Sequence, residues 1–166
     1  MCLVKGVYDD AYNKALEIKE EKGMTFIHPF NDPDVIAGQG TIGLEILNQL
    51  PDADIVVVPI GGGGLIGGVA YTIKQLKPSC KVYGVQAAGA PSMEKSILNG
   101  EIETLDNVNT IADGIAVKTP GDLTYELCQK YVDGIVTVTD DEIALAILTL
   151  LEPVSYTHLT LPTTER

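Results

Sequence analysis

A continuous run of apolar, mostly β-branched residues, "DIVVVPI" at residues 54–60, constrains the fold of this chain more than any other feature. A strand with one solvent-exposed face alternates apolar and polar residues, whereas this run shows no alternation. Uninterrupted apolar strands are typical of parallel sheets that carry helices on both faces. We therefore expect residues 54–60 to form a strand that is buried on both faces.

Segments typical of strands and of helices alternate along the whole chain. This order predicts an α/β fold, a three-layer sandwich in which helices cover both faces of a parallel sheet. Asp122 is the expected N-cap of one of the helices. The expected strands cover residues 2–7, 24–29, 54–60, 81–87 and 133–139, and the expected helices cover residues 8–23, 32–50, 65–78, 91–100, 119–132 and 140–152.

The composition excludes several kinds of partner. The formal net charge of −12 argues against binding to nucleic acid or to an anionic membrane surface. No apolar run approaches the roughly 20 residues of a membrane span, and "MCLVKGVYDD" does not read as a signal peptide, so a cytoplasmic location is expected. The three cysteines are scattered, which is typical of small apolar residues rather than of disulfides or metal ligands.

Four consecutive glycines, Gly61 to Gly64, join the apolar strand to the next helix. Ligands of open α/β sheets bind at the carboxyl ends of the strands, where this loop lies. The first N–H groups of a helix have no partner within the helix, and a phosphate group can accept hydrogen bonds from them. The loop therefore predicts a phosphate site. The alternative is a tight turn with close packing between helix and strand, for which one or two glycines would suffice.

The residues next to the glycines indicate which class of phosphate ligand the loop binds. Gly62, Gly64 and Gly67 match the dinucleotide pattern G-x-G-x-x-G, which requires an acidic residue at the end of the next strand. That strand ends with Gln86 instead, so NAD is disfavoured. The residues after Gly64 do not supply the G-K-[ST] of a nucleoside-triphosphate loop. A phosphate monoester remains.

Three strings resemble one enzyme family: "FIHPFNDPDVIAGQGTIGLEIL", "VVVPIGGGGLIGGVA" and "TIADGIAV". They are similar to the threonine dehydratase and serine racemase group of pyridoxal-phosphate enzymes, which have fold type II, the tryptophan synthase β-like fold. The resemblance covers residues 1–152, which we expect to be part of a catalytic domain. Within the group, the chain looks most like a threonine ammonia-lyase of the catabolic type.

The resemblance implies a cofactor, pyridoxal 5'-phosphate, and an amino-acid substrate. The cofactor acts as an electron sink while L-threonine loses its α-proton and its β-hydroxyl, and the resulting enamine hydrolyses to 2-oxobutanoate and ammonia. A serine dehydratase or racemase of the same group, or a non-catalytic domain that binds a phosphate ligand, are the alternatives. By the resemblance, the cofactor-binding residues are Gly61, Gly62, Gly63, Gly64 and Leu65 at the phosphate and Gly114 near the ring.

Departures from the family pattern limit what the chain is expected to do. The strings S-x-K-x-R-G, which holds the Schiff-base lysine, and S-G-N-H-A are absent. We therefore expect a fragment that keeps the phosphate loop, supplies no catalytic residue and derives from a homo-oligomeric enzyme. Gln86 and Ser92 stand where racemases of the group bind a metal, so no metal is expected. Residues 153–166 contain "VSYTHL", which looks like translated sequencing adapter, and are expected to be non-native or a disordered tail.

Three further residues near these motifs have expected roles. His28 precedes a proline at a predicted strand end, and we expect it to be structural because no partner for catalysis is evident. Asp113 precedes Gly114 and is expected to orient that loop rather than to react. Gln39, among the glycines that begin the second helix, is expected to pack near the sheet, with contact to the cofactor side as the alternative.

Overall fold

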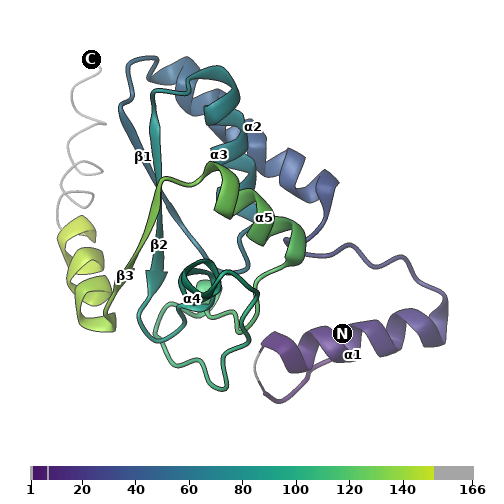
Figure 1. Cartoon of the computed structure of the whole chain (residues 1–166). Coiled ribbons are helices and arrows are strands. Elements are labelled where there is room, and N and C mark those ends of the chain that lie inside the picture. The colour runs from purple at the N-terminus through teal and green to yellow at the C-terminus, as the bar shows by residue number, and fades with distance from the viewer. Residues whose placement is uncertain (1, 7, 152–166) are drawn as a thin grey trace, which may run out of the picture.

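The computed structural model describes residues 2–6 and 8–151 and contains a parallel sheet (Figure 1). Its strands are β1 (Ile55–Pro59), β2 (Lys81–Ala87) and β3 (Gly134–Val138), in the order β1-β2-β3. Both neighbouring pairs are parallel, as the sequence predicts. The expected tail, residues 153–166, lies outside the described residues.

Each of the predicted helices is present in the described part of the chain. α3 and α5 lie on one side of the sheet, and the helical residues 140–151 lie on the other (Figure 1). The fold is therefore of the α/β class. The helices are α1 (Tyr8–Lys22), α2 (Pro33–Gln49), α3 (Gly64–Leu76), α4 (Ser92–Asn99) and α5 (Asp122–Tyr131), with a short 3-10 helix η1 (Asp113–Ile115).

Local signals explain where several helices begin and end. The Asp32 carboxylate caps α2 by accepting hydrogen bonds from the N–H groups of Asp34 and Val35, and proline follows Asp32. α4 ends at Asn99 and is capped by Gly100, whose φ of +79° favours glycine. The prediction that Asp122 is an N-cap is wrong, because it is the first residue of α5 and its carboxylate accepts a hydrogen bond from Asn31.

Two predicted strands are absent. Residues 2–6 and 24–29 form no strand, and residue 7 lies outside the description. Phe26 and His28 instead contact Tyr12 of α1, with ring centroids 5.6 Å and 5.4 Å apart. The sequence 24–29 has the apolar and aromatic residues of a strand, but a strand also needs a neighbouring ladder, and here aromatic packing replaces it.

The prediction that β1 is buried on both faces is wrong for this chain. Val58 is 5% exposed and faces α3, whereas Ile55 and Val57 on the opposite face are 58% and 62% exposed. Val136 of β3 is also half exposed on this second face. Among the described residues, only the helical segment 140–151 lies on this side of the sheet, and it leaves β1 uncovered.

The core lies between the sheet and α3. Cys80 and Cys128 belong to it, as expected for small apolar residues, whereas Cys2 is exposed. Burial raises the pKa of Cys128 to about 12, so its thiol stays protonated. The largest fully buried apolar side chains in this cluster are Ile60, Ile66, Ile73, Met93, Val69 and Val82.

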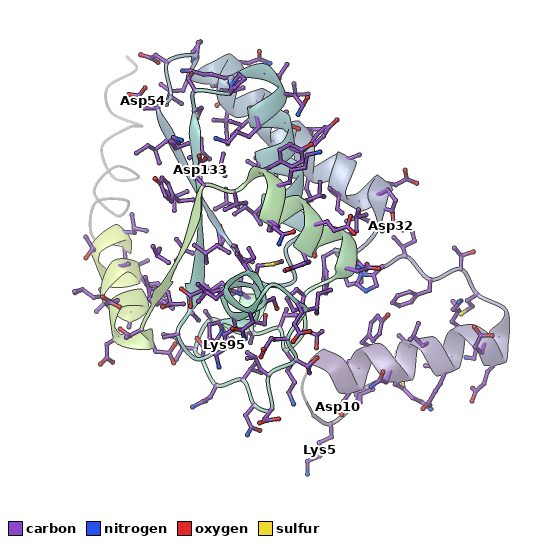
Figure 2. The ribbon with its side chains drawn as sticks, viewed as in Figure 1. Lys5, Asp10, Asp32, Asp54, Lys95 and Asp133 are labelled. Atoms are coloured by element: carbon purple, nitrogen blue, oxygen red, sulfur yellow. The ribbon has the colours of Figure 1, made fainter. Side chains whose placement is uncertain are left out.

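Asp133 links α3 to the sheet at the junction of α5 and β3 (Figure 2). Its carboxylate contacts the ammonium groups of Lys74 at 2.6 Å and Lys81 at 2.9 Å, and accepts a hydrogen bond from the Val82 N–H. Burial alone would raise the pKa of Asp133, but these partners lower it from 3.8 to about 2. The ionised carboxylate is therefore stabilised in the folded chain.

Asp133→Asn is expected to lower the free energy of unfolding by about 1–2 kcal/mol at pH 7, with allowance for solvent around Lys81. Because the folded pKa is depressed, this stability is present above the unfolded pKa and is lost as the pH falls from about 4 towards 2. Urea denaturation at pH 7, 4 and 3 measures the difference, with Asp141→Asn on the exposed start of segment 140–151 as control. If the difference in unfolding free energy between the parent chain and Asp133→Asn were as large at pH 3 as at pH 7, this account would be contradicted.

Candidate functional site: a glycine loop on a cavity

The four glycines follow β1 and lead into α3, and they border a cavity of about 400 Å³. Pro59 at the carboxyl end of β1 also lines the cavity, as expected for a ligand site of an α/β sheet. The segment 113–117, which includes Gly114, forms another wall. The cavity thus brings together all six predicted cofactor-binding residues: Gly61, Gly62, Gly63, Gly64, Leu65 and Gly114.

The main chain of this loop offers hydrogen-bond donors. Within the described residues, no protein group accepts a hydrogen bond from the N–H groups of Gly61 to Gly64. Their neighbouring carbonyls are used: Gly63 accepts from the Gly67 N–H at 2.9 Å, and Gly62 accepts from the Thr124 hydroxyl at 2.6 Å. The donors lie at the positive end of α3, so the arrangement suits an anion.

Packing against protein atoms accounts for the glycines themselves. A Cβ on Gly62 would lie 2.5 Å from the ring of Phe30, and a Cβ on Gly64 would lie 2.9 Å from the Cα of Phe30. A Cβ on Gly63 would lie 2.6 Å from the Met93 Cε, and φ at Gly63 is +95°. Contacts with Phe30 and Met93, which the sequence did not predict, thus require glycine at three of the four positions, and the free N–H groups carry the argument for a ligand.

The turn before α2 supports the loop from one side. The His28 Nδ1 accepts hydrogen bonds from the N–H groups of Phe30, at 3.3 Å, and Asn31, at 2.8 Å. This atom must be unprotonated to accept them. Burial lowers the pKa of His28, which also favours the neutral imidazole. The prediction of a structural role for His28 is confirmed, because the residue positions Phe30 beneath the glycines.

Asn31 connects this turn to α5. Its side-chain amide donates to the Asp122 carboxylate at 2.7 Å, and its side-chain oxygen accepts from the Leu123 N–H at 3.1 Å. The bond from Asn31 lowers the pKa of Asp122. The start of α5 is therefore held close to the glycine loop, although the two are about sixty residues apart in the sequence.

Gln86 lies buried at the carboxyl end of β2, and all of its polar atoms are used within the protein. Its amide nitrogen is 3.4 Å from the Ile60 carbonyl oxygen and 3.3 Å from that of Ala90, and its oxygen accepts from the Glu94 N–H at 2.8 Å. Ser92 is the other residue that the sequence comparison with racemases placed at a metal position. Its hydroxyl donates to the Val117 carbonyl at 2.9 Å. Over residues 2–6 and 8–151, no cluster of three or more His, Cys, Asp or Glu side chains could hold a metal ion.

The remaining predictions near the site have mixed outcomes. Packing against the sheet was predicted for this part of α2, but Gly40 packs against α3, while Gln39 lines the cavity, which was the alternative. Asp113 also lines the cavity. Phe30, Asn31 and Thr124 were not predicted as parts of the site, and no local pattern could have identified them. Phe30 and Thr124 contact the glycine loop across about 30 and 60 residues of sequence, and Asn31 contacts the start of α5 across about 90.

A sequence model of the family described as "Pyridoxal-phosphate dependent enzyme" matches residues 1–155. The L-threonine ammonia-lyase of Thermotoga maritima is 59% identical over 146 residues, which are 88% of this chain and 36% of that protein. The catabolic L-threonine dehydratase TdcB of Escherichia coli K12 is 49% identical over 145 residues, 87% of this chain and 44% of that protein.

A solved structure gives the same likeness in three dimensions. The processed form of threonine deaminase isoform 2 from Solanum lycopersicum superposes with a TM-score of 0.87 at 46% identity, over 91% of this chain and 42% of that one. The chain thus spans less than half the length of each of these three relatives. None of the helices described here is both long and apolar enough to cross a lipid bilayer.

Proposed function

Because the chain belongs to the pyridoxal-phosphate dependent enzyme family, we propose that its cavity binds the phosphate of pyridoxal 5'-phosphate as part of a threonine ammonia-lyase. One observation carries this proposal: the N–H groups of Gly61 to Gly64 face no acceptor within the described protein and border a cavity at the start of α3. A phosphate monoester supplies several acceptor oxygens and negative charge at one point, which matches this row of donors.

The walls of the cavity suit the rest of the cofactor. Phe30, Leu65, Ile115 and Val117 give it an apolar lining beside the polar loop. Cofactor sites typically combine such apolar walls with a few placed polar groups. We propose that Gly61 to Leu65 hold the phosphate and that Gly114, on the opposite segment, lies next to the pyridine ring.

When bound, the cofactor supplies an electron sink for removal of the α-proton and elimination of the β-hydroxyl of L-threonine, and hydrolysis of the released enamine by water gives 2-oxobutanoate and ammonia. The residues of this chain bind and orient the cofactor through its phosphate. No lysine of the described residues lines the cavity. We therefore propose that the chain is a fragment and that the amine that reacts with the cofactor lies outside it.

Binding by the 166-residue chain tests this proposal. Equilibrium dialysis should show that pyridoxal 5'-phosphate binds, that pyridoxal binds at least about tenfold more weakly, and that inorganic phosphate competes, because the phosphate supplies the main contacts. Equal binding of both cofactor forms would contradict the phosphate site. Inorganic phosphate that binds as tightly as the cofactor would favour the alternative, a non-catalytic phosphate-binding domain.

A second measurement tests the missing amine. After incubation with the cofactor, borohydride reduction and peptide mass mapping should find no lysine labelled stoichiometrically, and the chain should release no 2-oxobutanoate from L-threonine. Stoichiometric labelling of one lysine would show that the chain contains the reactive amine after all. Preference for threonine over serine and a homo-oligomeric parent enzyme stay predictions.

A further inference from the structure

Thr124 is a fully buried polar residue whose hydroxyl contacts the glycine loop. It lies in the first turn of α5, is 0% exposed, and does not line the cavity. Its hydroxyl is 2.6 Å from the Gly62 carbonyl oxygen and 3.1 Å from the Gly121 carbonyl oxygen. The hydroxyl has one proton, and the shorter distance favours Gly62 as its acceptor.

The bond from Thr124 determines the direction of the next donor. The Gly62–Gly63 peptide is trans, since the structure contains no cis peptide bond in its described part, and a trans peptide directs its C=O and N–H groups to opposite sides. Thr124 holds the Gly62 carbonyl on the α5 side of the loop. The Gly63 N–H must then point away from α5, and Gly63 itself lines the cavity.

Other contacts at this peptide show that the arrangement is close. The Gly121 N–H approaches the same carbonyl oxygen at 3.5 Å, so the residue that precedes α5 also contacts Gly62. A Cβ on Gly63 would lie 2.9 Å from the Thr124 Cβ. The Thr124 hydroxyl thus bonds to the carbonyl that precedes Gly63, and the Thr124 side chain packs against Gly63 itself. Gly63 is the one residue of the loop with a left-handed φ, +95°.

We propose that Thr124 is a positioning residue for the cofactor phosphate, because it fixes the Gly62–Gly63 peptide with the Gly63 N–H directed at the anion. This inference rests on the proposed function of the loop. Without the hydroxyl, the carbonyl of Gly62 keeps only the long bond from the Gly121 N–H at 3.5 Å, and the peptide is held less firmly against rotation of the donor away from the phosphate. The hydroxyl is predicted to act on affinity through orientation, with no contact to the ligand.

The test compares variants of the 166-residue chain that separate the hydroxyl from packing. Thr124→Val keeps the shape and removes the hydroxyl, and it should raise the Kd for pyridoxal 5'-phosphate about tenfold. Thr124→Ser restores the hydroxyl and should stay within about threefold of the parent chain. Ser96→Ala is the control, since Ser96 is equally buried, bonds to the Ser92 carbonyl and does not line the cavity; its Kd should not change.

The amide signal of Gly63 gives a second readout without ligand. Its chemical shift should move in Thr124→Val and stay near its parent value in Thr124→Ser and Ser96→Ala. If the valine variant does not fold, Thr124→Ala serves in its place with the same expected tenfold loss. An unchanged Kd without the hydroxyl, or an equal loss in the serine variant, would overturn this inference alone. A parent chain that does not bind the cofactor would overturn the proposed function, and this inference with it.

Discussion

Gly68→Ala is expected to lower the free energy of unfolding by about 3 kcal/mol, because α2 and α3 touch at this glycine. A Cβ there would lie 2.3 Å from the Ile36 carbonyl oxygen and 2.7 Å from the Gly40 backbone nitrogen. Both are backbone atoms of α2, so neither can rotate out of the way. The two helices would have to separate along their whole contact, which includes Gly43 against Thr72. Urea denaturation followed by circular dichroism measures the loss.

Gly38→Ala in α2 is the matched control for this prediction. Gly38 is exposed, and a Cβ there would meet no atom within 4 Å. Alanine is a better helix former than glycine, so this variant should be more stable by about 0.5–1 kcal/mol. If both variants changed stability in the same direction and by a similar amount, the close contact between α2 and α3 would be wrong.

Gly63→Ala is expected to damage both the fold and the site. The residue has a φ of +95°, and its new Cβ would lie 2.6 Å from the Met93 Cε and 2.9 Å from the Thr124 Cβ. Left-handed strain and overpacking together should lower the free energy of unfolding by about 3 kcal/mol. Relief of that strain moves the N–H groups of the loop, and we expect the Kd for pyridoxal 5'-phosphate to rise at least about 30-fold.

Gly100→Ala is the control that measures the effect of backbone strain at a position outside the site. Gly100 also has a left-handed φ, +79°, but a Cβ there would meet nothing within 4 Å and the residue lies outside the cavity. This variant should lose about 1 kcal/mol of stability and keep the affinity of the parent chain. If Gly63→Ala bound the cofactor as tightly as Gly100→Ala, the loop would not hold the phosphate.

The strands and helices with strong local patterns were predictable. The run "DIVVVPI" and the following glycines identified β1 and the start of α3, and Pro33 and Gly100 marked helix ends. The parallel sheet followed from the alternation of strand and helix. These features depend on residues that are neighbours in the sequence, so a reader of the sequence has all the information that determines them.

Features that depend on distant partners were not predictable. Residues 24–29 have strand-like composition, but their contacts with Tyr12 replace a ladder. The apolar run of β1 indicates burial on two faces, yet which face is covered depends on elements elsewhere in the chain. Phe30 and Thr124 contact the glycine loop across 30 or more residues, and an isolated phenylalanine or threonine carries no local sign of such a contact.

The most direct test of the phosphate site is a 1H–15N spectrum of the 166-residue chain, titrated in parallel with pyridoxal 5'-phosphate and with pyridoxal. The phosphate site predicts that the amide signals of Gly61 to Gly64 shift with the phosphorylated ligand, and shift much less or not at all with pyridoxal. Gly100 and other amides remote from the cavity should stay unchanged in both titrations. Equal shifts with both ligands, or shifts that leave the four glycines unaffected while other residues respond, would contradict it.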